Sequence, residues 1–176
     1  MQAIEVQQIK GDSPRKDETL LRFVERFALV ITEAGLPRMQ ARVFAYALAE
    51  DSERYTAAEL AEGLGVSRAA ISSATRALVR GGLLGREREP GARVDTYRVY
   101  DNDIWEAINR ARLPILEKYV EVLTQGIELL GPDSRGGQRL LETSAYLRFM
   151  SEELPKLNEE WHNRKNELVA KMRAGL

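Results

Sequence analysis

The stretch from Thr56 to Arg80 constrains the fold most, because its pattern is that of two short amphipathic helices joined by a turn. Thr56 and Glu59 have the spacing of a capping box, in which a hydroxyl and a carboxylate each accept a hydrogen bond from a backbone amide. Gly65 is expected to take a positive φ at the bend, and Ser67 is a good N-cap for the second helix. We therefore predict a helix-turn-helix with an apolar stripe on each helix, formed by Leu60, Ala61, Leu64, Ile71, Ala74 and Leu78.

The outward face of the second predicted helix carries short side chains and arginines, and no acidic residue lies between Ser67 and Arg80. Serine and alanine let a helix approach base edges closely, and arginine binds guanine or phosphate. The alternative is an ordinary solvated face, but such a face usually mixes glutamate with lysine. We expect this face to read DNA in the major groove through Ser67, Arg68, Ala69, Ser72, Ser73, Arg76 and Arg80.

A β-hairpin is predicted after the second helix. Residues 83–87 and 95–99 have the character of short strands, and residues 89–92 give a turn signal between them. Two strands after a recognition helix form a wing, and Arg86, Arg88 and Arg93 on this wing are suited to phosphates or a minor groove. The alternative is a solubilising hairpin in which the residues from Arg86 to Asp95 form local ion pairs with Glu87 and Glu89.

Charge is distributed unevenly along the 176 residues, whose formal net charge is −1. Residues 67–100 contain seven arginines and three acids, which is a net charge of +4, so the remainder carries −5. A basic face on an acidic body favours oriented binding of a polyanion.

The composition argues against enzymatic chemistry. The chain has no cysteine and a single histidine, His162, so disulfides, thiolate sites and histidine-based metal clusters or triads are not expected. No nucleophile–base pair or phosphate-binding glycine loop is present either. We predict no catalytic residue, no cofactor and no metal. With no signal peptide and no 18-residue apolar span, we expect a cytoplasmic protein without a membrane partner.

The remaining segments complete a mainly α chain with a small β wing. Residues 1–15 are expected to form a flexible N-terminal arm, and residues 16–34 and 38–50 are expected to be helices. We divide the chain into a winged helix-turn-helix domain, residues 38–100, and a helical dimerisation domain, residues 16–37 with 101–176.

Two long helices are predicted after the wing, the first kinked at Pro114 and the second starting after Gly131-Pro132. Helices of this length cannot bury their apolar stripes alone, and a homodimer would cover them. The alternative is an antiparallel hairpin of the two helices within one chain, which can coexist with dimerisation. The residues expected at the dimer interface are Phe23, Phe27 and the heptad series Leu140, Leu147, Leu154, Trp161 and Leu168.

The order of these elements resembles the MarR family of bacterial transcription regulators, and the segment TAAELAEGLGVSRAAISSATRALVRGGLLGREREPGARVDTYRVYD carries the resemblance. The long final helix is similar to the GbsR-like branch and to mycobacterial regulators of lipid-exporting efflux pumps. The resemblance implies an obligate homodimer on a pseudo-palindromic operator in double-stranded DNA, usually repressing a neighbouring transporter gene or its own. The wing tip departs from the common pattern of an aspartate followed closely by two arginines, because Pro90-Gly91-Ala92 precedes Arg93 here.

The expected mechanism is a change in the separation of two recognition helices, which must match about 34 Å to enter successive major grooves. A small hydrophobic or cationic effector in a cleft between the winged domain and the long helices would favour another separation. Candidate lining residues are Phe27, Met39, Phe44, Trp105 and Ile108, although the same residues could simply fill the core and the dimer interface. The alternative function is a winged-helix module that binds proteins and not DNA.

Overall fold

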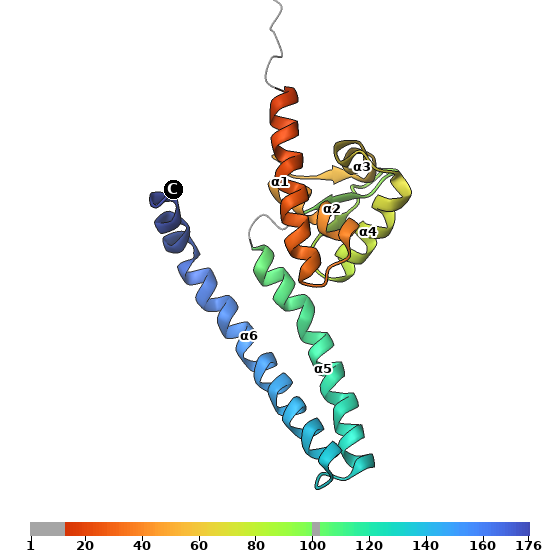
Figure 1. The fold of residues 1–176 in the computed structure, drawn as a ribbon, viewed down its shortest axis with the longest axis vertical. Helices are drawn as coiled ribbons and strands as arrows, with labels where there is room; N and C mark the ends of the chain where they lie inside the picture. The colour runs from red at the N-terminus through yellow and green to blue at the C-terminus, as the bar shows by residue number, and fades with distance from the viewer. Residues whose placement is uncertain (1–12, 100–102) are drawn as a thin grey trace, which may run out of the picture. The chain divides into compact units, whose positions relative to one another are not determined.

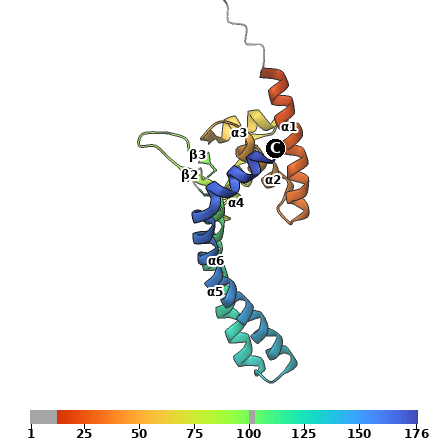
Figure 2. The same ribbon diagram turned by 90° about the vertical axis from the view of Figure 1, so that its left-hand side faces the viewer.

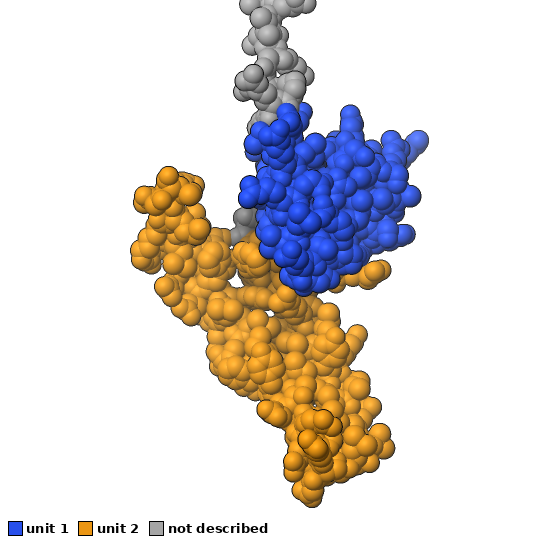
Figure 3. Space-filling view, viewed as in Figure 1, with its two compact units in different colours: residues 1–79, 84–99 blue, residues 80–83, 100–176 orange. Residues whose placement is uncertain are grey.

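The computed structural model describes residues 13–99 and 103–176, which divide into two compact units (Figures 1 and 3). The first unit contains the described residues up to Val79 together with Leu84–Val99, and the second contains Arg80–Leu83 and the long C-terminal helices. Six helices and three short strands form the described part of the chain. The predicted fold class, mainly α with a small β wing, is confirmed. Most of the predicted arm, residues 1–12, lies outside the described residues.

The first unit begins with two packed helices, α1 (Ser13–Glu33) and α2 (Arg38–Ala49). Helix α1 starts three residues earlier than residue 16, the predicted start. Val24 and Ala28 are its fully buried residues, and they lie against the apolar side of α2, where Val43 and Phe44 are buried. Helix α1 is thus a structural part of the winged unit. The assignment of residues 16–37 to a dimerisation domain, together with the long C-terminal helices, stays a prediction.

The helix-turn-helix consists of α3 (Ala57–Leu64) and α4 (Arg68–Arg80). The predicted capping box is confirmed, because the Thr56 hydroxyl accepts from the Glu59 amide and the Glu59 carboxylate accepts from the Thr56 amide. Gly65 has φ +63°, which is the left-handed conformation expected at the bend. All six residues of the predicted apolar stripes are buried.

The wing belongs to a three-stranded antiparallel sheet with the strand order β1-β3-β2. Its strands are β1 (Tyr55–Thr56), β2 (Gly85–Glu87) and β3 (Thr96–Arg98), shorter than the strands predicted from the sequence. Tyr97 pairs with Tyr55 on one side and with Arg86 on the other. Tyr55 is buried and its hydroxyl donates to the Glu50 carboxylate at 2.7 Å, so the sheet is attached to the end of α2.

The second unit is a hairpin of α5 (Ile104–Leu130) and α6 (Arg135–Ala174), which run side by side in opposite directions (Figures 1 and 2). Ser134 caps α6 by accepting a hydrogen bond from the Gly137 amide at 2.9 Å. Gly137 must be glycine, because a Cβ there would lie 1.9 Å from the Gly131 carbonyl oxygen. Between the helices, Asn109 donates to Asn158 at 2.7 Å.

Two prolines lie inside the helices of the hairpin. Pro114 does not end α5, in agreement with the sequence, and Pro155 lies within α6. Within the described residues, no helix is long and apolar enough to span a membrane.

Candidate nucleic-acid interface

Helix α4 has one buried and one exposed face. Ile71, Ala74, Thr75 and Leu78 are buried. The residues predicted to contact DNA are all exposed, and they are Ser67, Arg68, Ala69, Ser72, Ser73, Arg76 and Arg80. The first turn is ordered by Ser67, whose hydroxyl accepts from the Ala70 amide at 3.3 Å. The face predicted from the sequence is therefore available to a ligand, and its contact with DNA is a proposal.

Thr75 was not recognised in the sequence as a buried residue. Its side chain is fully buried, and its hydroxyl donates to the Ile71 carbonyl one turn earlier at 2.9 Å. The hydrogen bond satisfies the hydroxyl inside the core, since the carbonyl four residues earlier is a standard acceptor for threonine in a helix. Polar residues on α4 are consequently not all on its outer face.

The arginines of α4 are not neutralised by the protein. Among residues 13–99 and 103–176, Arg68, Arg76 and Arg80 have no ion-pair partner, and all three are exposed. An unpaired guanidinium on a helix with no acid keeps its donors and its full charge for phosphate or guanine. This helix face is the most strongly cationic part of the predicted site.

The wing differs, because Arg86 and Arg88 on it have an acidic neighbour. Arg88 Nε lies 2.7 Å from Asp95 Oδ1, and Arg86 Nη1 lies 3.9 Å from Asp95 Oδ2. The hydrogen bond from Arg88 lowers the pKa of Asp95 below its ordinary value, so this carboxylate is charged at neutral pH. Arg93 is exposed, and no ion pair reaches it from the described residues. Ion pairs are thus present on the hairpin, but Arg86 and Arg88 pair with Asp95 and not with Glu87 or Glu89, the partners in the alternative interpretation.

A further arginine at the wing was missed from the sequence. Arg54, just before β1, has Nη1 at 3.1 Å from Glu89 and 3.9 Å from Glu87. Glu87 also pairs with Arg98, whose Nε lies 2.8 Å away. Pairing of β1 with β3 brings Arg54 to the wing over more than thirty residues of sequence, and no local pattern indicates this. All three acids of the hairpin are therefore engaged by arginines.

The residues predicted to line a ligand cleft are divided between the two units. Phe27 and Met39 are half-buried and Phe44 is buried in the first unit, whereas Trp105 is 58% exposed and Ile108 is buried in the second. A groove of about 450 Å³ lies within the second unit, lined by Glu106, Arg110, Leu113, Pro155, Asn158, Glu159 and His162. It contains none of the five predicted residues, whose role at a ligand stays a prediction.

The residues predicted for the dimer interface lie in two places. Phe23 is exposed on α1 and stacks on Phe27 with ring centroids 5.6 Å apart. In the heptad series of α6, Leu154 is buried and Leu140, Leu147, Trp161 and Leu168 are half-buried.

The heptad of α6 is covered at least partly by α5 of the same chain. A Cβ on Gly126 of α5 would lie 2.9 Å from Leu140 Cδ1, so glycine permits this close approach. The hairpin within one chain is therefore present, as the sequence left open. The hairpin leaves further large apolar residues exposed, and they include Tyr119, Val122, Tyr146, Phe149 and Leu157.

Comparisons with known proteins agree with this architecture. A family model described as "MarR family" matches residues 34–93, and one described as "MmpR5-like MarR family transcriptional regulator" matches residues 103–164. The chain is 28% identical over 141 residues to the HTH-type transcriptional regulator MmpR5 of Mycobacterium tuberculosis, a match that covers 79% of this chain and 84% of the relative. A crystal structure described as that of a transcriptional regulator is similar with a TM-score of 0.74 and 25% identity, covering 83% of this chain and 99% of the other.

Proposed function

This chain belongs to the MarR family of winged-helix transcriptional regulators, and on that basis we propose that it binds a pseudo-palindromic operator as a homodimer and represses transcription. The regulated gene in this proposal is a neighbouring transporter gene or the regulator's own operon. The observation that carries the proposal is the exposed, acid-free face of α4 with three unpaired arginines.

Two kinds of contact with DNA follow from this geometry. The short residues at the start of α4, Ser67 and Ala69, allow the helix to enter the major groove, and Arg68 beside them can make a bidentate contact to guanine. Arg93 on the wing is suited to the phosphate backbone or the adjacent minor groove. The helix would supply sequence preference, and the wing would add affinity that depends little on sequence.

The homodimer is supported by the apolar residues that one chain leaves exposed. Phe23 and Val30 of α1, Tyr119 of α5 and Tyr146 and Phe149 of α6 are each at least 47% exposed. Each unit thus exposes more than one large apolar side chain, and a second copy of the chain is one partner that could cover them. A second copy related by a twofold axis would cover the same residues on both chains and present two recognition helices to a palindromic site.

We further propose that a small hydrophobic or cationic effector releases the operator by changing the separation of the two recognition helices. The aromatic and sulfur-containing side chains of Phe27 and Met39 in the first unit support this part, since such groups suit apolar ligands and organic cations. The mechanism requires no covalent chemistry, so we propose that the protein is a regulator and not an enzyme.

Fluorescence anisotropy with labelled duplex DNA over a series of salt concentrations tests the DNA-binding step. We expect the logarithm of the association constant to fall linearly with the logarithm of salt concentration, because phosphate contacts release counterions. Arg68→Ala and Arg76→Ala should weaken binding. Arg139→Ala, an exposed arginine of α6 with no ion pair in the described chain, is the matched control and should bind as the wild type does. Equal binding by all three variants would contradict the proposed site.

A further inference from the structure

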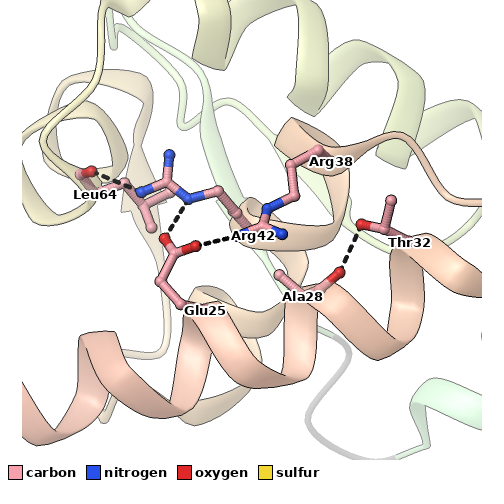
Figure 4. Close-up of polar contacts among 6 residues, drawn as sticks. All are labelled: Glu25, Ala28, Thr32, Arg38, Arg42 and Leu64. Carbon is pink, nitrogen blue, oxygen red and sulfur yellow. Dashed lines mark hydrogen bonds and ion pairs between the residues drawn. The ribbon is translucent and has the colours of Figure 1, made fainter.

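A carboxylate on α1 holds two arginines of α2 (Figure 4). Glu25 Oε1 accepts from Arg42 Nε at 2.6 Å, and Glu25 Oε2 accepts from Arg38 Nη2 at 2.5 Å. The side chain of Arg42 is only 19% exposed, while those of Glu25 and Arg38 are about twice as exposed. The guanidinium of Arg42 is therefore held in orientation by Glu25 and largely buried.

The other end of the Arg42 guanidinium reaches the helix-turn-helix. Arg42 Nη2 donates to the Leu64 carbonyl oxygen at 3.2 Å (Figure 4). Leu64 is the last residue of α3, and its carbonyl is one of those that no amide of the helix can satisfy. The preceding carbonyls of Ala61 and Glu62 accept from the amides of Gly65 and Val66 in the turn. Arg42 thus caps the C-terminus of α3 with a charged donor, where a cation also interacts favourably with the helix dipole.

The capped carbonyl lies next to the start of the recognition helix. Gly65 makes the left-handed bend directly after Leu64, and Ser67 caps α4, which begins at Arg68. The first residues of a recognition helix are those that contact base edges. A binding site retains its geometry only when the residues behind it hold it within about 0.5 Å. Any displacement of Leu64 is carried into Ser67 and Arg68 over three or four residues of chain.

We propose that Arg42, oriented by Glu25, is a positioning residue for DNA binding that fixes the turn of the helix-turn-helix to α1 and α2. This inference rests on the proposed function, since it concerns the same recognition helix. Arg42 contacts no DNA in this account. It keeps the N-terminal end of α4 in the orientation that enters the groove.

A purely structural ion pair would give a different result. Partly exposed ion pairs contribute little to stability, so loss of the Arg42 contacts should leave the protein folded. If Arg42 were only structural, the folded variant would bind DNA as the wild type does. If Arg42 contacted phosphate, the salt dependence would change along with the affinity, because fewer counterions would be released.

The test compares Arg42→Met with the wild type by anisotropy across a salt series. Methionine keeps the length of the aliphatic chain and removes every donor. We expect the variant to bind an operator duplex roughly ten- to a hundredfold more weakly, the factor that corresponds to one charge-assisted hydrogen bond, with an unchanged salt slope. Arg42→Lys should lose part of this affinity, because one ammonium group cannot replace both contacts at their two distant acceptors. Arg22→Met is the matched control, since it removes an exposed arginine of α1 that pairs with Glu18 at 2.6 Å, and it should bind normally.

Hydrogen exchange of the amides of residues 65–70 supplies a readout that does not depend on DNA. We expect faster exchange in Arg42→Met and no change in Arg22→Met. Wild-type affinity and wild-type exchange in Arg42→Met would overturn the positioning role, and a reduced salt slope would make Arg42 a phosphate contact instead. If the wild type bound no duplex DNA, the proposed function would fail, and the exchange result alone would decide whether Arg42 positions the turn.

Discussion

Asp95→Asn on the wing is expected to tighten binding to any duplex DNA. Asp95 pairs with both Arg86 and Arg88, at 3.9 Å and 2.7 Å. The pKa of Asp95 is lowered by its hydrogen bond from Arg88, so the carboxylate is charged at neutral pH and competes with phosphate for both guanidinium groups. Asparagine keeps the size and a hydrogen-bond acceptor but removes the charge.

The size of the expected gain in DNA affinity follows from the charge of the hairpin. Residues 85–98 carry four arginines and three acids, a net charge of +1, which becomes +2 in the variant. One additional phosphate contact steepens the slope of log association constant against log salt by about 0.9. The electrostatic contribution of this contact to the affinity vanishes near 1 M salt. Over the one decade of salt concentration down to roughly 0.1 M, the steeper slope therefore corresponds to about eightfold tighter binding per wing.

The assay is a salt titration by anisotropy with an operator duplex and with a scrambled duplex. The gain should be equal on both, since phosphate contacts carry no sequence information. Glu128→Gln, an exposed acid of α5 in the other compact unit, makes the same change in net charge and should have little effect. If Asp95→Asn instead weakened binding with an unchanged slope, Asp95 would position Arg88 for DNA, and the competition argument would be refuted.

Four further predictions concern recognition and stability. Arg68→Ala should cost about 1–3 kcal/mol on an operator duplex and little on a scrambled one, so the ratio of the two affinities falls; a uniform loss would make Arg68 a phosphate contact. Thr56→Ala removes the capping box of α3 and should lower the free energy of unfolding by about 1 kcal/mol, and Leu78→Ala, at a fully buried position, by about 2–5 kcal/mol, both measured by urea denaturation. Glu25→Gln should make the free energy of unfolding fall less steeply as the pH is lowered into the acid range. Burial raises the pKa of Glu25, but hydrogen bonds from Arg38 and Arg42 lower it, and the net result is a folded-state pKa below 4.5. The stabilisation from the charged carboxylate is therefore present above that pH and is lost as the pH falls through the folded-state pKa. If the free energy of unfolding fell with equal slope at acid pH in the wild type and in Glu25→Gln, the last prediction would be contradicted.

The sequence was most informative where the determinants are local. The capping box of Thr56 and Glu59, the left-handed Gly65 and the buried stripe through Ile71 and Leu78 all depend on residues within one or two turns of each other. Such spacing follows directly from helical geometry, and the wing that follows has equally local turn signals. The helix-turn-helix and its exposed face, predicted from these features, are present in the structure.

Features that depend on distant residues were not predictable in the same way. Arg54 reaches Glu89 only because β1 pairs with β3, and Arg42 reaches Leu64 only because α2 packs beside α3. Each of these arginines resembles an ordinary surface residue in the sequence. Thr75 was overlooked for another reason, since a buried threonine that bonds to its own helix leaves no signal in hydrophobic periodicity.

The heptad of α6 illustrates what periodicity leaves open. A stripe at seven-residue spacing indicates that a surface is covered, but the covering helix is not specified. In this chain α5 packs against α6, and Leu140 approaches Gly126 closely. The exposed set with Tyr119, Tyr146 and Phe149 lies at other positions of the two helices, which the heptad did not indicate.

Selection of duplexes from a random pool tests the central claim, sequence-specific binding by a dimer, most directly. The protein should first be unfolded, dialysed and refolded, so that no co-purified small molecule holds it in a released state. The account predicts enrichment of an inverted repeat whose half-site centres lie about 10 base pairs apart, and loss of that enrichment in Arg68→Ala. Refolded protein that enriches no sequence, and retains DNA only weakly and without preference, would contradict the account and favour a winged-helix domain that recognises proteins.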